Sequence, residues 1–140
     1  MDSRLLRNRA RTAEAMTFLA IARMLRAARP TYSVRKLAGK PQVAEGLATG
    51  EPQAPSGIEH VVSAAIERGS YRLPMSTTCL DRAIAGRWML LRRSANATIV
   101  IGLLTEDPAQ GVHAWLVGDQ GGTITGAQEM ADFTAITHFR

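Results

Sequence analysis

Two side chains in this sequence have the types and settings of a nucleophile and its base. Cys79 follows Thr78 and precedes Asp81, a spacing typical of a capping box, so the cysteine is expected in the first turn of a helix. Free backbone N–H groups and the helix dipole favour an anion there, which lowers the pKa of a thiol. His113 lies in the apolar run 112–117, which predicts a strand. A cysteine opening a helix and a histidine on a later strand form the arrangement that a thiolate–imidazole pair requires.

Each of these residues, taken alone, also fits a purely structural role. A lone cysteine commonly packs as a small hydrophobic residue, and a histidine in an apolar strand is commonly a hydrogen-bonded core residue. The single cysteine excludes an internal disulfide framework. One cysteine and three scattered histidines also argue against a metal site, so we expect no metal and no bound cofactor.

The elements that position this pair are predicted to be helices in the first part of the chain and strands in the second. Apolar residues recur at helical spacing in the first part, and β-branched apolar runs dominate after residue 96. Ser56 is a candidate N-cap and Gly69 a candidate end for the second helix. The pattern predicts an α+β fold, with N-terminal helices packed on an antiparallel sheet. The expected helices are 3–29, 58–69 and 79–93, and the expected strands are 98–104, 112–117, 123–125 and 133–139.

The chain of 140 residues has the length of one domain, which we divide into three segments. Residues 1–38 hold a basic helix, and residues 58–140 form the core that carries the cysteine and the histidine. Between them, residues 39–57 are rich in Pro and Gly and poor in large apolar groups, so they read as a linker.

Positive charge is concentrated at the N-terminus. Residues 1–40 have a net charge of +8, whereas residues 41–140 have a net charge of −3. The basic face of the first helix fits a solvated surface, or a docking surface for an acidic partner, a peptide or a membrane. Binding to nucleic acid is disfavoured, because the chain lacks aromatic stacking residues and a recognisable reading motif.

The N-terminal segment carries no clear targeting signal. Its apolar stretch, residues 15–22, is far shorter than the ~20 residues that span a bilayer. Arginines follow it where a signal peptide would have small residues, so we expect a cytoplasmic protein with a reduced cysteine. An arginine-rich amphipathic start also resembles a mitochondrial presequence, which remains an alternative.

Several short motifs, in their order and spacing, resemble the leader peptidases of lasso-peptide biosynthesis. They are Thr78-Cys79-Leu80-x-Arg82-Ala83, an apolar helix ending Leu90-Leu91-Arg92-Arg93, then Ile99-Val-Ile-Gly102 and His113-Ala-Trp115. These bacterial enzymes are stand-alone members of the transglutaminase-like branch of papain-type cysteine proteases. The resemblance covers residues 58–140 well, and the basic helix before them is similar too.

This resemblance implies both a reaction and a set of partners. The chain would remove the leader from a ribosomally made precursor peptide, with Cys79 as nucleophile and His113 as general base and then acid. A separate winged-helix leader-binding protein would present the precursor. An ATP-dependent cyclase similar to asparagine synthetase would then close the macrolactam, so ATP would be used by the cyclase and not by this chain.

The third member of the catalytic group is not evident from the sequence. The family usually carries an Asp on the strand after the histidine, but residues 124–127 contain no carboxylate. Asp119 is one candidate, although six residues of strand span about 20 Å. Gln128 or Glu129 would lie opposite His113 if the hairpin turn centres on residues 120–121. The alternative function is a weakly active or inactive transglutaminase-like module that binds the precursor or the cyclase.

Overall fold

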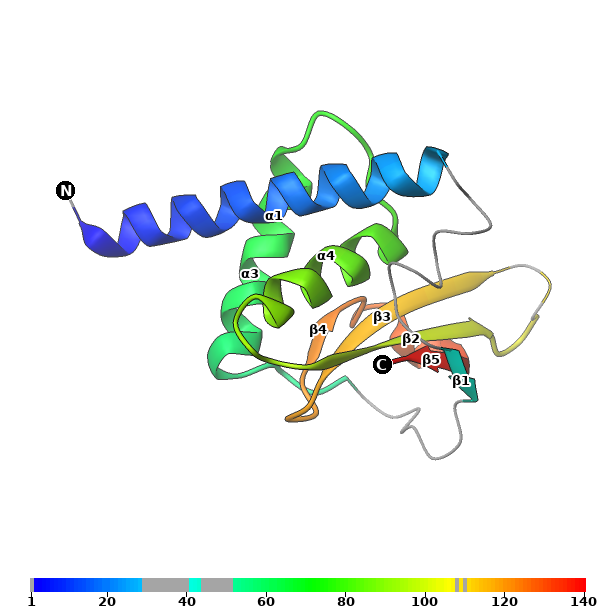
Figure 1. Cartoon of the computed structure of the whole chain (residues 1–140). Coiled ribbons are helices and arrows are strands. Elements are labelled where there is room, and N and C mark those ends of the chain that lie inside the picture. The colour runs from blue at the N-terminus through cyan, green and yellow to red at the C-terminus, as the bar shows by residue number, and fades with distance from the viewer. Residues whose placement is uncertain (1, 29–40, 44–51, 108, 110) are drawn as a thin grey trace.

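The computed structural model describes residues 2–28, 41–43, 52–107, 109 and 111–140. Its helices and strands form three layers (Figure 1). Helix α1 (Ser3–Ala28) lies across α3 (Gly57–Arg72) and α4 (Cys79–Leu91), and these two helices lie between α1 and the sheet. The arrangement confirms the predicted α+β fold with helices on an antiparallel sheet.

The sheet has the strand order β1-β5-β2-β3-β4 within the described residues. Strands β2 (Ala97–Leu104) and β3 (Val112–Gly118) form its centre, with Gly102 opposite His113. The short β4 (Thr123–Thr125) extends the sheet beside β3, and β5 (Phe133–Phe139) returns to pair with β2. A 3-10 turn, η1 (Met130–Asp132), precedes β5. The chain therefore folds back over the start of β3, where the histidine lies.

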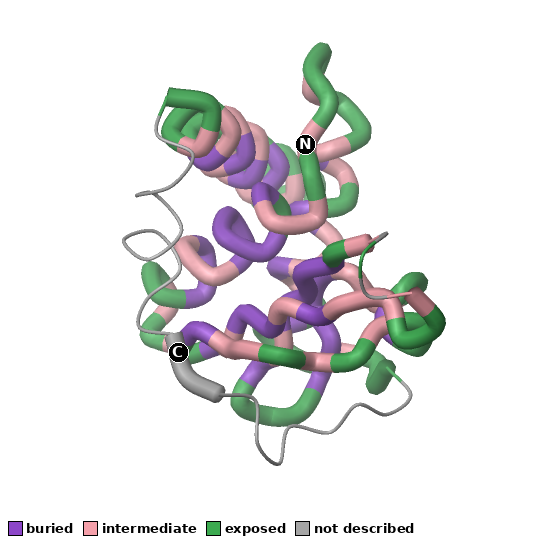
Figure 2. Tube along the Cα trace, turned by 90° about the vertical axis from the view of Figure 1, so that its right-hand side faces the viewer, coloured by how far each residue is buried: buried purple, intermediate pink, exposed green. Residues whose placement is uncertain are grey.

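The main core forms where the helical layers meet the sheet. Buried residues, purple in Figure 2, lie on the inner sides of the helices and along the central strands. The first helix contributes Ala15, Leu19 and Ala22 to the same cluster as residues of α3, α4 and β2. Full burial of a leucine side chain contributes roughly 1.5–3 kcal/mol. Helix α1 is thus held by apolar packing as well as by polar contacts.

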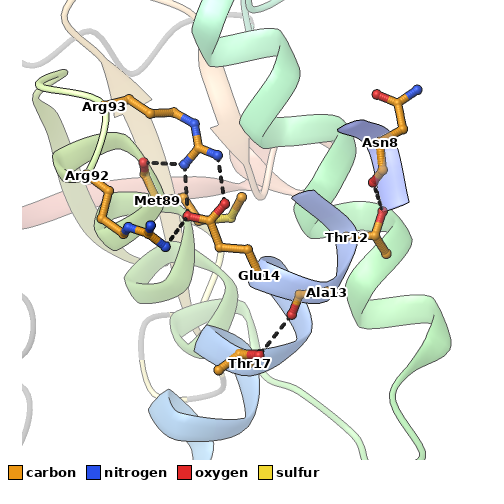
Figure 3. Close-up of polar contacts among 8 residues, drawn as sticks. All are labelled: Asn8, Thr12, Ala13, Glu14, Thr17, Met89, Arg92 and Arg93. Carbon is orange, nitrogen blue, oxygen red and sulfur yellow. Dashed lines mark hydrogen bonds and ion pairs between the residues drawn. The ribbon is translucent and has the colours of Figure 1, made fainter. Parts of the chain in front are cut away.

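A bidentate ion pair ties the middle of α1 to the C-terminal end of α4 (Figure 3). Arg93 donates through Nη2 to Glu14 Oε2 at 2.7 Å and through Nη1 to Glu14 Oε1 at 2.9 Å. Arg92 adds a third bond to Glu14 Oε1 at 3.0 Å. The two hydroxyls drawn on α1, those of Thr12 and Thr17, bond back to carbonyls of their own helix.

Two details of the second helix differ from the sequence-based expectation. Gly69 does not end α3, which continues to Arg72. A Cβ at Gly69 would lie 3.0 Å from the Cβ of Ala15, so this glycine permits the close approach of α1 instead. Ser56 occupies the N-cap position but makes no side-chain cap bond, and its Oγ lies 3.4 Å from Gln120 Oε1.

The segment expected as a linker contributes one strand to the sheet. Residues Pro41–Val43 form β1, which pairs antiparallel with β5 at the sheet edge. Residues 44–51 of that segment lie outside the described residues, and Gly57 begins α3. Among the helices described, none is both long and apolar enough to cross a membrane.

Candidate active site

Cys79 is the first residue of α4, and a complete capping box fixes its position. The Thr78 hydroxyl accepts a hydrogen bond from the backbone N–H of Asp81 at 3.2 Å. In return, Asp81 Oδ2 accepts one from the backbone N–H of Thr78 at 2.9 Å. This geometry confirms the predicted box with Asp in place of the usual Glu or Gln. The thiol consequently sits beside backbone N–H groups that have no partner within the helix.

The surroundings of the Cys79 sulfur favour a thiolate. The backbone N–H of Ala114, on β3, donates to Sγ at 3.4 Å. Burial on its own raises the pKa of the Cys79 thiol. The hydrogen bond from His113, the Ala114 N–H and the charge of His113 outweigh burial, so the pKa is lowered from 9.0. The strand that carries the histidine thus also supplies a backbone donor to the nucleophile.

The imidazole of His113 is buried and held at one nitrogen by a backbone carbonyl. Nε2 lies 3.0 Å from the carbonyl oxygen of Gly126. A carbonyl oxygen only accepts, so this contact assigns a proton to Nε2 of the neutral ring and leaves Nδ1 as its basic nitrogen. Burial lowers the pKa of His113, but the bonds to Cys79 and the Gly126 carbonyl, and the charges of Cys79 and Glu129, raise it above 6.5.

Aromatic rings fix the plane of the imidazole. Trp115 stacks beside the His113 ring with centroids 5.8 Å apart, and Phe133 lies at 5.1 Å. Trp115 is itself 2% exposed and belongs to a second apolar cluster that also contains Val100 and Met130. The ring therefore has little freedom to turn away from the sulfur.

Gly126 occupies the stretch in which the sequence lacks the expected carboxylate. Its φ is +78°, a backbone conformation that L side chains rarely adopt. A Cβ there would lie 2.9 Å from His113 Nε2 and 2.8 Å from the Cβ of Trp115. A glycine is needed to bring this carbonyl to the imidazole. Sequence reasoning did not single out Gly126, although a glycine directly after a short strand was a usable signal.

Glu129 is the one proposed orienting residue that reaches the histidine. Its Oε2 lies 3.3 Å from Nδ1 of His113, while 68% of its side chain is exposed. Gln128 lines the same cavity but makes no hydrogen bond to the ring within the described residues. Asp119 is exposed in the turn after β3, at the opposite end of that strand from His113. The structure thus brings Cys79, His113 and Glu129 together and leaves Asp119 apart.

A cavity of about 330 Å³ opens over the cysteine and the histidine. Glu67, Arg82, Thr125 and Gly126 are among its lining residues. Glu67 and Arg82 also line a second, more open hollow that extends toward Tyr71. The two hollows therefore share residues, and the first of them contains the thiol. Within the described residues, no group of three or more His, Cys, Asp or Glu side chains is placed to hold a metal ion.

This geometry has the parts of a covalent acyl-transfer site. The thiol can lose its proton to Nδ1 of a neighbouring imidazole whose other nitrogen is already bonded. Backbone N–H groups at the start of α4 lie beside Cys79 without an intrahelical acceptor, and donors of this kind stabilise an oxyanion. The cavity leaves the thiol half-buried and reachable.

Comparison with known proteins agrees with this chemistry at the level of a family. The family model described as the transglutaminase-like superfamily matches residues 15–138, which is most of the chain and includes the larger part of α1. No curated protein and no solved structure matches the chain.

Proposed function

The chain belongs to the transglutaminase-like superfamily, and from that premise we propose that it is the leader peptidase of a lasso-peptide pathway. Domains of this superfamily are generally of the cysteine-protease type. The observation that carries the proposal is the buried His113 beside the half-buried Cys79, whose pKa the imidazole lowers, both lining one open cavity. The finer assignment, to lasso precursors, rests on the motifs around these two residues.

The proposed reaction is acyl transfer through a thioester. Cys79 passes its proton to His113 Nδ1, and the thiolate attacks the scissile carbonyl carbon to give a tetrahedral oxyanion. Backbone N–H groups of the first turn of α4 stabilise that oxyanion. When the C–N bond breaks, His113 gives the proton to the leaving amine, which departs with the core peptide. His113 then takes a proton from water, whose oxygen attacks the thioester and releases the leader as a carboxylate.

His113 is oriented by a backbone carbonyl and not by a carboxylate in this proposal. The Gly126 carbonyl holds Nε2–H, and Glu129 stands beside Nδ1 where it stabilises the imidazolium. A neutral acceptor at Nε2 stabilises the charged ring less than an Asp would. We therefore expect a working but slower peptidase than one with the family's carboxylate.

We assign the remaining steps of the pathway to separate proteins. A winged-helix leader-binding protein would present the precursor peptide, and an asparagine-synthetase-like cyclase would use ATP to join the freed amine to an Asp or Glu side chain. This chain would bind no cofactor and would act in the cytoplasm. The basic face of α1 is a candidate contact for a partner or a membrane.

The test is cleavage of the precursor encoded beside this chain's gene, followed by mass spectrometry. The leader-binding protein and the cyclase are supplied, and the wild-type chain is compared with Cys79→Ala and His113→Ala. We expect the wild type to release an intact leader and both variants to release none. Ser70→Ala is the matched control, because Ser70 lines the cavity but its hydroxyl, among the described residues, bonds to the carbonyl of Glu67 alone. That variant should cleave within about threefold of the wild-type rate.

A second function is favoured by the lack of a carboxylate at residues 124–127. In that case the chain binds the precursor or the cyclase without cutting. Normal maturation by Cys79→Ala would support this binding role and contradict the peptidase. Absence of cleavage by the wild type as well as by the variants, while the partners demonstrably bind the leader, would do the same.

A further inference from the structure

Arg26 of α1 completes the cap of the helix that carries the nucleophile. Its Nη1 donates to Asp81 Oδ1 at 2.6 Å and to the Thr78 hydroxyl at 2.6 Å. Thr78 and Asp81 are the two residues of the capping box directly around Cys79. The N-terminus of α4 is therefore held by a side chain from a helix that lies more than fifty residues earlier in the sequence.

The Asp81 carboxylate requires this contact because the carboxylate is buried. The Asp81 side chain is 0% exposed, and that of Arg26 is 28% exposed. A buried carboxylate needs a hydrogen-bonded cation to balance its lost hydration. Arg26 is the only cation that forms an ion pair with Asp81 among the described residues.

The charge of Asp81 lies in the same helical turn as the thiol. Asp81 follows Cys79 by two residues, in the same first turn of α4. An uncompensated carboxylate there would oppose formation of a second negative charge on the sulfur. It would also cancel the favourable field that the helix terminus offers to a thiolate.

We propose that Arg26 is a positioning residue of the active site, which clamps the α4 cap and neutralises Asp81 so that Cys79 ionises in place. Helix α1 is then a working part of the catalytic centre as well as a packing element. The proposal rests on the proposed role of Cys79 as nucleophile. It does not depend on which peptide is cut.

A matched control is available at the C-terminal end of α4. Arg93 joins α4 to α1 through Glu14, also with a bond of 2.7 Å, but at the C-terminal end of α4 (Figure 3). Loss of either arginine removes one ion pair between α1 and α4. Only the loss of Arg26 disturbs the end that holds Cys79.

The experiment is the pH dependence of alkylation by iodoacetamide, measured by intact mass on the full chain. The chain has one cysteine, so the label reports on Cys79 alone. We expect Arg26→Gln to raise the apparent pKa of the thiol and to slow alkylation at pH 7 by about tenfold. Arg26→Lys keeps the positive charge and should stay within about threefold of wild type. In Arg93→Gln, the Cys79 thiol should show the same apparent pKa as in the wild type.

A double variant keeps the proposal testable if Arg26→Gln does not fold. Arg26→Gln with Asp81→Asn removes both charges while retaining groups that can hydrogen-bond. Its thiol should titrate close to the wild-type pKa, because no uncompensated carboxylate remains beside the sulfur.

Three results would overturn the proposal. They are an unchanged titration in Arg26→Gln, an equal shift in Arg93→Gln, and a thiol pKa in the double variant raised as far as in Arg26→Gln. If the pKa of the Cys79 thiol depends on Arg26 but the wild-type chain cuts no precursor, only the proposed peptidase function is contradicted. Failure of the two proposals is thus distinguishable.

Discussion

At the scale of single residues, the candidate site is defined by how the two nitrogens of one imidazole are used. The Gly126 carbonyl occupies Nε2 of His113, so Nδ1 remains for the proton of Cys79. Glu129, whose side chain is mostly exposed, lies 3.3 Å from Nδ1. Each group favours the charged form of the other, so the pKa of Cys79 is lowered and that of His113 is raised in spite of burial.

The predicted effect of Gly126→Ala follows from the space around this residue. The new Cβ would lie within 3 Å of His113 Nε2, the Ala114 carbonyl oxygen and the Trp115 Cβ. The imidazole must then shift, and a displacement of this kind typically costs about 100-fold in kcat/KM. Precursor cleavage and Cys79 alkylation are the measurements.

Gly57→Ala controls for backbone strain in that experiment. Gly57 also has a positive φ, of +56°, but in the described part of the chain nothing beyond its own sequence neighbourhood lies within 4 Å of where its Cβ would be. We expect about 1 kcal/mol of lost stability and an unchanged cleavage rate. Equal losses of activity in the two variants would show that strain, and not the position of the ring, explains the effect.

At the scale of elements, α4 is the central piece and α1 holds it at both ends. Arg26 reaches the N-terminal end of α4, and Glu14 reaches Arg92 and Arg93 just beyond its C-terminal end. Helix α1 also approaches α3 closely, where Gly69 of α3 faces Ala15 of α1. The nucleophile therefore sits on a helix that is fixed from outside its own sequence neighbourhood.

Glu14→Gln should destabilise the fold in a manner that depends on pH. The hydrogen bond from Arg93, together with the charges of nearby arginines, lowers the pKa of Glu14 below 4.5 despite partial burial. A lowered folded-state pKa contributes stability above pH 4.5, and this contribution is lost as the pH falls through the folded-state value. Urea unfolding at pH 7 should show a loss of about 1–2 kcal/mol in Glu14→Gln relative to wild type.

The same comparison at pH 3 should give a smaller difference, because the wild-type carboxylate then approaches protonation as well. Glu67→Gln is the control, since Glu67 is exposed and forms no ion pair within the described residues. A Glu14→Gln deficit that stays constant between pH 7 and pH 3 would contradict the ion-pair explanation.

At the scale of the whole molecule, α1 shares one apolar core with the sheet-bearing part of the chain. Leu19 is fully buried in the cluster that also contains Met89 and Ile99. Leu6, near the start of the same helix, is 46% exposed. The two leucines therefore test whether α1 unfolds with the rest of the molecule.

Leu19→Ala should lower the free energy of unfolding by about 2–5 kcal/mol, because it removes buried methyl groups and leaves a cavity. Leu6→Ala should change it by less than about 0.5 kcal/mol. Circular dichroism and Trp fluorescence should report one common transition for both variants. A separate early transition in Leu19→Ala would mean that α1 unfolds on its own.

Much of the fold could be predicted from local patterns. Apolar spacing marked the three long helices, and apolar runs, a hairpin turn and alternation marked the strands β2 to β5. The capping box could be predicted as well, because it depends only on residues three apart. The predicted end of α3 at Gly69 was wrong. Gly69 lies inside the helix, where the absence of a side chain permits close packing against Ala15 of α1.

The sequence by itself determined which residues carry reactive groups and in which elements they lie. Cys79 at a helix start and His113 on a strand follow from propensity and periodicity, which are local properties. Only the tertiary structure decided their partners: the Gly126 carbonyl on the imidazole, the Ala114 N–H on the sulfur and Arg26 on the cap. Two of these three partners are backbone groups, so residue types in the sequence cannot identify them. The third joins residues 55 apart in the chain, and only the packing of α1 on α4 brings them within hydrogen-bond distance.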